Sequence, residues 1–189
     1  YFVFSGSQQH MMEEMSLSAD RPFFQSSSMM TLSCIDKEKY LDFANNFFKG
    51  QSRAMDEDTF EYIYDVSDKV TWYVQAILHG IYEHSKDVID RQLVDDVVRE
   101  IIESQSTAYQ NYCAWLTENQ QRLLTAIARE RLVTSPLGQI FIRSYNLPAV
   151  SSVKAALKSL VDKQLISKTP QGYYVSDRFF AKWLSGHVF

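Results

Sequence analysis

The chain has 189 residues, of which 46% are hydrophobic, 22% charged and 14% aromatic, so its composition is that of a globular protein with a substantial core. No uninterrupted apolar run approaches the roughly 20 residues that a membrane-spanning helix needs, which excludes a transmembrane protein. The opening residues show no secretory leader pattern, and two distant cysteines, Cys34 and Cys113, do not form a disulfide framework. We expect a cytoplasmic protein in a reducing environment.

The net charge of −4 hides two parts of opposite sign. Residues 1–115 contain 9 Lys or Arg against 19 Asp or Glu, a balance of −10, whereas residues 116–189 contain 10 against 4, a balance of +6. A basic segment behind an acidic one indicates two modules, and the second could face a polyanion. A solvated surface is the alternative explanation of the same excess.

The chain begins with an apolar run, Tyr1-Phe2-Val3-Phe4. Such a run is typical of a strand that is buried on both faces in a parallel sheet. No partner strand is predicted in the next hundred residues, so we expect the rest of this sheet to lie upstream of residue 1. The sequence is therefore expected to be a fragment of a longer protein.

From Asp36 onward the hydrophobic pattern has a helical period. Asp36, Asp56 and Asp90 each stand where an aspartate caps the first turn of a helix, and Gly50 is placed to end the first of these helices. Another predicted helix has an apolar face made of Tyr73, Val74, Ile77, Leu78 and Ile81. We predict a bundle of four or five helices over residues 35–115.

The order of elements in residues 116–189 is that of a winged helix. A capping box, Thr117-Glu118-Asn119-Gln120, opens the first helix, and Ser135-Pro136 is expected to open the second. The third helix runs from about residue 150 to residue 163 and is followed by a two-stranded hairpin. Three helices and a hairpin make the helix-turn-helix variant known as the winged helix.

The hairpin and the last helix have clear local signals. Thr169-Pro170-Gln171-Gly172 has Pro and Gly at the positions that favour a turn, and it separates two short apolar strands. Asp177 is placed to cap a closing helix that carries Phe180, Trp183 and Leu184. The winged helix is thus expected to end in an additional helix with an aromatic face.

Several short segments occur in an order that resembles a known family. They are the strand followed by Ser5-Gly6-Ser7, the pair Met11-Met12, Arg21-Pro22-Phe23, the helical region, Leu116-Thr117 with Gln120, and the ending Tyr174, Arg178-Phe179-Phe180 and Trp183-Leu184. This succession resembles the C-terminal part of bacterial and archaeal STAND-type AAA ATPases, and it spans nearly the whole chain. The resemblance implies that residues 1–34 are a remnant of an α/β P-loop ATPase core, residues 35–115 a helical lid, and residues 116–189 the winged helix. The expected fold class is therefore mainly α, with a remnant core strand.

The resemblance also implies nucleotide-sensing residues. In that family, small polar residues after the fourth core strand act as sensor 1 near the terminal phosphate, a role that would fall to Ser5 or Ser7. The arginine before the lid lies close to the nucleotide or to a neighbouring subunit, and Arg21 matches it. The adenine and ribose dock on an aromatic-Val-Gln stretch, which here makes Tyr73 and Gln75 candidates.

The chain lacks the P-loop sequence Gly-x-x-x-x-Gly-Lys-Ser/Thr, whose backbone amides and lysine cradle phosphates. We therefore assign no catalytic residue and expect neither ATP hydrolysis nor a bound cofactor in this segment alone. The resemblance implies that ATP or ADP with Mg²⁺ binds to a core upstream of residue 1. No metal site is expected, because none of the four histidines lies within ligand spacing of another histidine or of a cysteine.

The winged helix offers the clearest surface for binding a partner. Residues of the types that contact phosphates and base edges are expected on the outer side of its third helix and on the wing: Ser151, Ser152, Lys154, Lys158 and Lys168. That helix has no arginine, although arginine is the commonest reader of guanine. Two hypotheses stay open. The chain is either a lid and winged-helix module that relays nucleotide state to a protein partner, or a DNA-binding transcription regulator with a helical dimerisation or sensing domain. A homo-oligomer is compatible with both.

Overall fold

The computed structural model describes residues 28–84 and 88–186, together with residues 3, 5, 6, 15, 16, 20, 24 and 26. The chain divides into two units, Tyr1–Cys34 and Ile35–Phe189. Three of the four residues of the predicted core strand, residues 1–4, lie outside the described residues, so that strand stays a prediction. The second unit carries the described helices and strands considered below.

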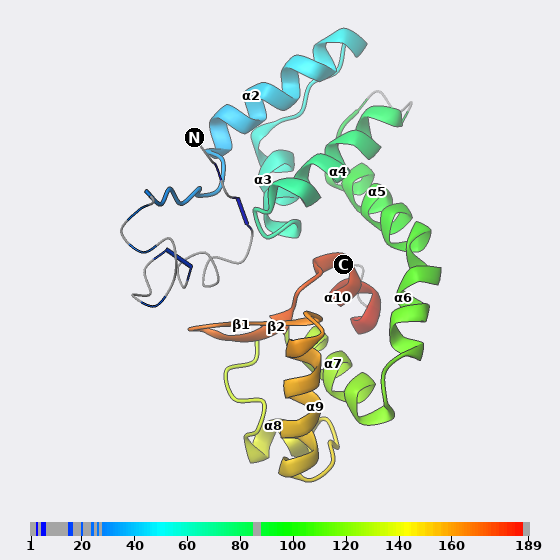
Figure 1. Ribbon diagram of the computed structural model, residues 1–189. Helices are drawn as coiled ribbons and strands as arrows, with labels where there is room; N and C mark the ends of the chain where they lie inside the picture. The colour runs from blue at the N-terminus through cyan, green and yellow to red at the C-terminus, as the bar shows by residue number, and fades with distance from the viewer. Residues whose placement is uncertain are drawn as a thin grey trace. The chain divides into compact units, whose positions relative to one another are not determined.

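The first part of the second unit is helical (Figure 1). Its elements are α2 (Lys37–Phe48), the 3₁₀ helix η1 (Lys49–Gln51), α3 (Glu57–Val66), α4 (Thr71–Glu83), α5 (Arg91–Ser104) and α6 (Ser106–Ala114). The three predicted aspartate caps are confirmed. Asp36 accepts a hydrogen bond from the amide of Lys39, Asp56 from that of Thr59, and Asp90 from that of Leu93, over 3.1, 2.7 and 2.8 Å.

The predicted end of the first helix was wrong in detail. Gly50 does not terminate α2, because the chain tightens at Lys49 into the short helix η1, which contains Gly50. The turn ends instead at Ser52, which adopts the left-handed conformation with a φ of 56°. A serine tolerates this single residue of left-handed backbone at a modest energetic cost.

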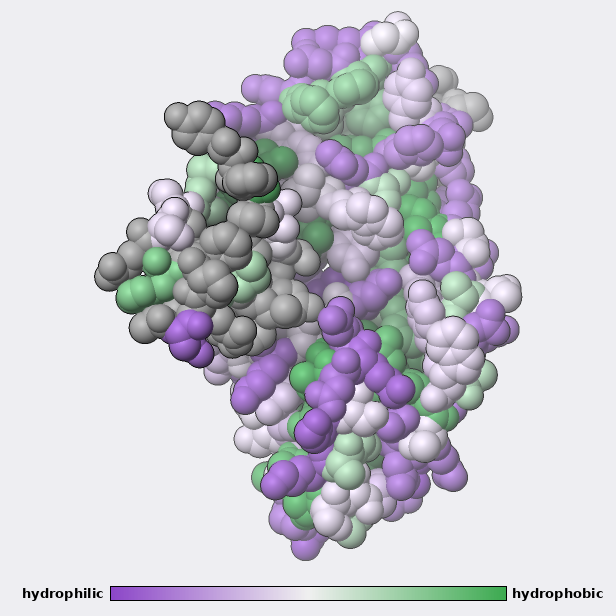
Figure 2. Space-filling view, viewed as in Figure 1, coloured by the Kyte–Doolittle hydropathy of each residue, from purple (hydrophilic) through white to green (hydrophobic). Residues whose placement is uncertain are grey.

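Helix α2 has one buried face, and its other side also carries aromatic residues. Tyr40, Ala44 and Phe48 are buried against the rest of the helical region. On the other side, Phe43 and Phe47 are 50% and 59% exposed, with ring centroids 5.0 Å apart. Figure 2 shows green hydrophobic residues among purple hydrophilic ones in this part of the molecule. The helix thus contributes one face to the core and leaves an aromatic pair in solvent.

The second part of the unit is a winged helix. Its elements are α7 (Glu118–Glu130), α8 (Gln139–Ser144), α9 (Val150–Asp162), β1 (Ile166–Thr169), β2 (Gly172–Val175) and α10 (Arg178–Ser185). The strands pair antiparallel, with Ile166 opposite Val175. Val133 adds an isolated bridge to Tyr173 on the other edge of β2. A Cβ at Gly172 would lie 2.6 Å from the carbonyl oxygen of Val133, so this close approach requires glycine. The predicted fold class, mainly α with a winged helix, is confirmed.

The predicted start of the second helix of the winged helix was wrong by several residues. Ser135 and Pro136 do not open α8, which begins at Gln139 with Gly138 as its N-cap. The segment forms a turn instead, in which the amide of Gly138 donates to the carbonyl of Ser135 over 2.9 Å. Pro at the second position and Gly at the fourth favour such a turn as strongly as Ser-Pro favours a helix start. The local sequence is therefore compatible both with a turn and with the start of a helix.

Helices α4 and α5 approach each other closely at Gly80. A Cβ placed on Gly80 would lie 2.4 Å from Cγ1 of Val97, which is almost completely buried. We predict that Gly80→Ala lowers the free energy of unfolding by about 1–2 kcal/mol, because the overpacking cost exceeds the gain in helix propensity. Urea denaturation followed by circular dichroism measures this change. Gly50→Ala is the matched control, since no atom lies within 4 Å of its Cβ. Equal effects of the two substitutions would contradict the packing.

Candidate functional site at the α10 junction

Helix α10 contacts both parts of the second unit. It packs on α7 and β2 of the winged helix and on α5 and α6 of the helical region (Figure 1). Asp177 begins the helix, as predicted, and its carboxylate accepts hydrogen bonds from the amides of Phe179 and Phe180 over 2.8 and 3.0 Å. Phe179 and Phe180 are buried almost completely. The last helix is therefore the element that joins the two parts.

Aromatic rings make most of this contact. The ring of Tyr73 on α4 meets Phe179 edge-on, with centroids 4.7 Å apart. The ring of Tyr109 on α6 stacks on Phe180 at 4.9 Å and lies 5.8 Å from Trp183. Such pairs contribute about 0.5–1.5 kcal/mol each beyond the burial of their surface. We call Tyr73, Tyr109, Phe179, Phe180 and Trp183 the α10 junction.

Polar contacts fix the orientation of the junction. The hydroxyl of Tyr73 accepts a hydrogen bond from the amide of Arg178 over 3.0 Å and donates to Asp177 over 3.3 Å. Burial raises the pKa of Tyr73 to about 12, so the hydroxyl keeps its proton at neutral pH. The Nε atom of Arg178 lies 2.7 Å from the carboxylate of Asp68, and its guanidinium stacks 4.2 Å from the ring centroid of Tyr174. The first turn of α10 is thus tied to the α3–α4 connection and to α4 itself.

At the other end of α10, the indole nitrogen of Trp183 donates to the hydroxyl of Ser106 over 3.1 Å. The hydroxyl of Tyr109 differs from the rest, because it is buried without a hydrogen-bond partner in the described part of the chain. Burial raises the pKa of Tyr109 above its usual range. An unsatisfied buried hydroxyl costs free energy, so this tyrosine contributes through its ring alone.

The predicted nucleotide-sensing residues are separated in the structure. Tyr73 lies in the α10 junction, whereas Gln75 is exposed and its side chain hydrogen-bonds Tyr40 on α2, a tyrosine whose pKa is raised by burial. Two positions two residues apart on a helix face different directions, so the two side chains do not converge. Ser5 is exposed, and Ser7 and Arg21 lie outside the described residues. The nucleotide-sensing roles of all five residues stay predictions.

The predicted outer face of the winged helix lies on α9 and β1. Ser151, Lys154, Lys158 and Lys168 are exposed, and Ser152 is half-buried. Two of the three lysines are engaged locally: Lys158 pairs with Asp162 at 2.6 Å, and the ammonium of Lys168 lies 5.8 Å from the ring centroid of Tyr173. This leaves a weak positive surface on α9, and its role in nucleic-acid binding stays a prediction.

Sequence analysis missed the junction as a site. Tyr109 and Trp183 carried no assigned role, and the pair between Asp68 and Arg178 was not predicted. One signal was available, namely the aromatic face that we expected on the closing helix. The hairpin beside this helix offers no partner for that face. Among the described residues, no three metal-binding side chains cluster. The same part of the chain contains no helix with both the length and the apolar character that crossing a bilayer requires.

Comparisons with known proteins agree with this architecture. Residues 107–186 match the family described as a probable winged helix domain. The chain is also similar in structure to a Walker-type ATPase of Pyrococcus abyssi, with a TM-score of 0.59 and 14% identity over 79% of this chain. It covers 42% of the length of that protein. A search of curated proteins finds no match. At this identity the structural similarity establishes the fold alone. Neither the family match nor the structural similarity favours the DNA-binding hypothesis. The STAND-type affiliation stays a prediction.

The two junction tyrosines should respond in opposite ways to loss of their hydroxyls. We predict that Tyr73→Phe lowers the free energy of unfolding by about 1–3 kcal/mol, because it removes two hydrogen bonds at a charged capping residue. Tyr109→Phe should leave stability unchanged or raise it by about 1 kcal/mol, because it removes an unsatisfied polar atom. Urea denaturation measures both, with the exposed Tyr112→Phe as control. Equal destabilisation by the two junction variants would contradict the assigned contacts.

Proposed function

We propose that the chain is the helical-lid and winged-helix module of a P-loop ATPase, and that the α10 junction relays the nucleotide state of the lid to the winged helix. The fold similarity to a Walker-type ATPase and the winged-helix match support the first part. A single observation supports the relay. Tyr73, which belongs to the stretch that resembles the adenine-docking segment of the lid, bonds directly to the first turn of α10.

The described residues include no glycine-rich phosphate loop. In the proposal, ATP or ADP with Mg²⁺ is held by a core upstream of residue 1, with Ser5, Ser7 and Arg21 near the phosphates. A protein partner receives the signal from the winged helix in the cytoplasm, where the molecule acts alone or as a homo-oligomer. The ATPase activity belongs to the whole protein, of which this chain is a part.

The relay depends on the geometry of α4. Trp72 on this helix is 56% exposed, and its ring lies beside that of Tyr73, with centroids 4.9 Å apart. Tyr73 contacts α10 through its ring and its hydroxyl. Because a helix moves as a rigid element, a shift of α4 on nucleotide exchange displaces the N-terminus of α10 and with it the winged helix. Helix α4 therefore connects nucleotide exchange directly to the displacement of the winged helix, without an intermediate segment.

Hydrogen exchange on the natural full-length protein tests the proposal. We predict that it binds ATP and ADP in calorimetric titrations, and that amides of residues 178–185 exchange at different rates in the two complexes. Tyr73→Phe should retain nucleotide binding and reduce this difference, because the link from α4 to Arg178 is lost. Tyr112→Phe is the matched control and should behave as wild type. Absence of nucleotide binding would refute the ATPase assignment. Binding without any change in α10 would refute the relay.

A further inference from the structure

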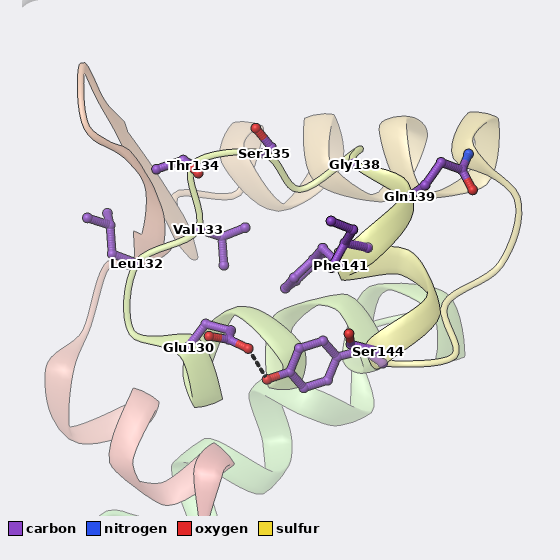
Figure 3. Close-up of a pocket in the computed structure, with 11 residues that line it drawn as sticks. Glu130, Leu132, Val133, Thr134, Ser135, Gly138, Gln139, Phe141 and Ser144 are labelled. Carbon is purple, nitrogen blue, oxygen red and sulfur yellow. Dashed lines mark hydrogen bonds between the residues drawn. The ribbon is translucent and has the colours of Figure 1, made fainter.

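The winged helix has an open pocket of about 530 Å³ between the end of α7, the segment that follows it, and α8 (Figure 3). Val133 and Phe141 point into this pocket, whereas Leu132 and Gln139 point away from it. Ile140 also lines the pocket and is 85% exposed, an unusual position for a large aliphatic side chain. The pocket therefore presents apolar surface to a partner.

One carboxylate lines the pocket, and it is already engaged. The hydroxyl of Tyr145 donates to Oε1 of Glu130 over 2.6 Å, drawn as the dashed line in Figure 3. This hydrogen bond raises the pKa of Tyr145, with burial as a smaller cause. The pair closes one side of the pocket and fixes the ring of Tyr145 as its wall.

A second hollow of about 300 Å³ adjoins the first, and Tyr145 lines both. Arg122 and Arg129 line this second hollow, and neither forms an ion pair among the described residues. Arg122 donates to the carbonyl of Asn146, and Arg129 is exposed. The apolar pocket thus shares the wall made by Tyr145 with a hollow lined by two arginines.

The backbone beside the pocket is joined to the hairpin by one bridge. Both hydrogen-bonding groups of Val133 are used by Tyr173, each over 2.9 Å. Thr134, the next residue, lies in a bend, so the pairing with the hairpin ends at Val133. Among the described residues, the amide of Thr134 has no partner. A partner at this place is therefore held by side chains and not by a strand ladder.

We propose that this groove binds an acidic segment of a partner protein, which places a bulky apolar side chain between Val133 and Phe141 and a carboxylate on Arg122 and Arg129. Charge complementarity supports an acidic partner. The apolar walls favour a polypeptide over a nucleic acid, since a polypeptide can fill them with an apolar side chain. The site shares no residue with the α10 junction, so it stands independently of the proposed relay.

Fluorescence anisotropy with the full chain tests the site. The probe is the labelled peptide Gly-Ser-Glu-Ser-Phe-Ser-Glu-Ser-Gly, in which one strand face presents Phe flanked by Glu about 7 Å away on each side. We expect saturable binding that falls about tenfold in Ile140→Ser and in Arg129→Ala. Both positions are exposed, so folding should be unaffected. Lys154→Ala, an exposed lysine on α9, is the matched control and should bind as wild type.

Three results would overturn the proposal. The first is no binding up to about 1 mM peptide, which corresponds to less than ~4 kcal/mol of binding free energy. The second is equal binding of a peptide with Lys in place of Glu, or with Ser in place of Phe. The third is tighter binding of a labelled oligothymidine that is lost in the same two variants, which would make the groove a nucleic-acid site. Nucleotide binding by the longer protein has no influence on any of these results.

Discussion

The packing of α10 between two groups of helices is the constraint on which the rest of the second unit depends. A helix of eight residues is not stable alone in water, so α10 forms only because both of its sides are covered. Phe179 and Phe180 fill the space beside α7, and Tyr73 and Tyr109 close it from α4 and α6. Without this helix, the winged helix and the helical region would each expose aromatic surface.

The polar groups of the junction fix the orientation of α10 relative to α4. Asp177 satisfies the first amides of α10 and also accepts the hydroxyl of Tyr73, so one carboxylate both starts the helix and attaches it to α4. Arg178 adds a link to Asp68 just before α4. A displacement of α4 therefore acts on the first turn of α10, the part of that helix that most requires its cap. This arrangement suits the transmission of a conformational change better than a purely apolar contact would.

Sequence predicted those features of the fold that are local. The caps at Asp36, Asp56 and Asp90 were predictable because each acts within three residues. The start of α8 was not, because Ser-Pro-x-Gly fits a turn equally well. The junction could not be predicted at all, since Tyr73 and Asp177 are separated by 104 residues, and a hydrophobic period identifies a buried face without identifying its partner. For the same reason the sequence did not predict the groove beside α8, where Tyr145 forms a hydrogen bond with Glu130.

Calorimetric unfolding of the full chain tests the central claim most directly, namely that α10 makes the helical region and the winged helix one cooperative unit. The double variant Tyr73→Ala with Asp68→Ala removes the polar links between the first turn of α10 and the helical region, together with the ring of Tyr73, and leaves the sequence of α10 intact. We predict that the wild-type second unit unfolds in one transition, and that the double variant unfolds in two. Two transitions in the wild type, or a single transition in the double variant, would contradict this account.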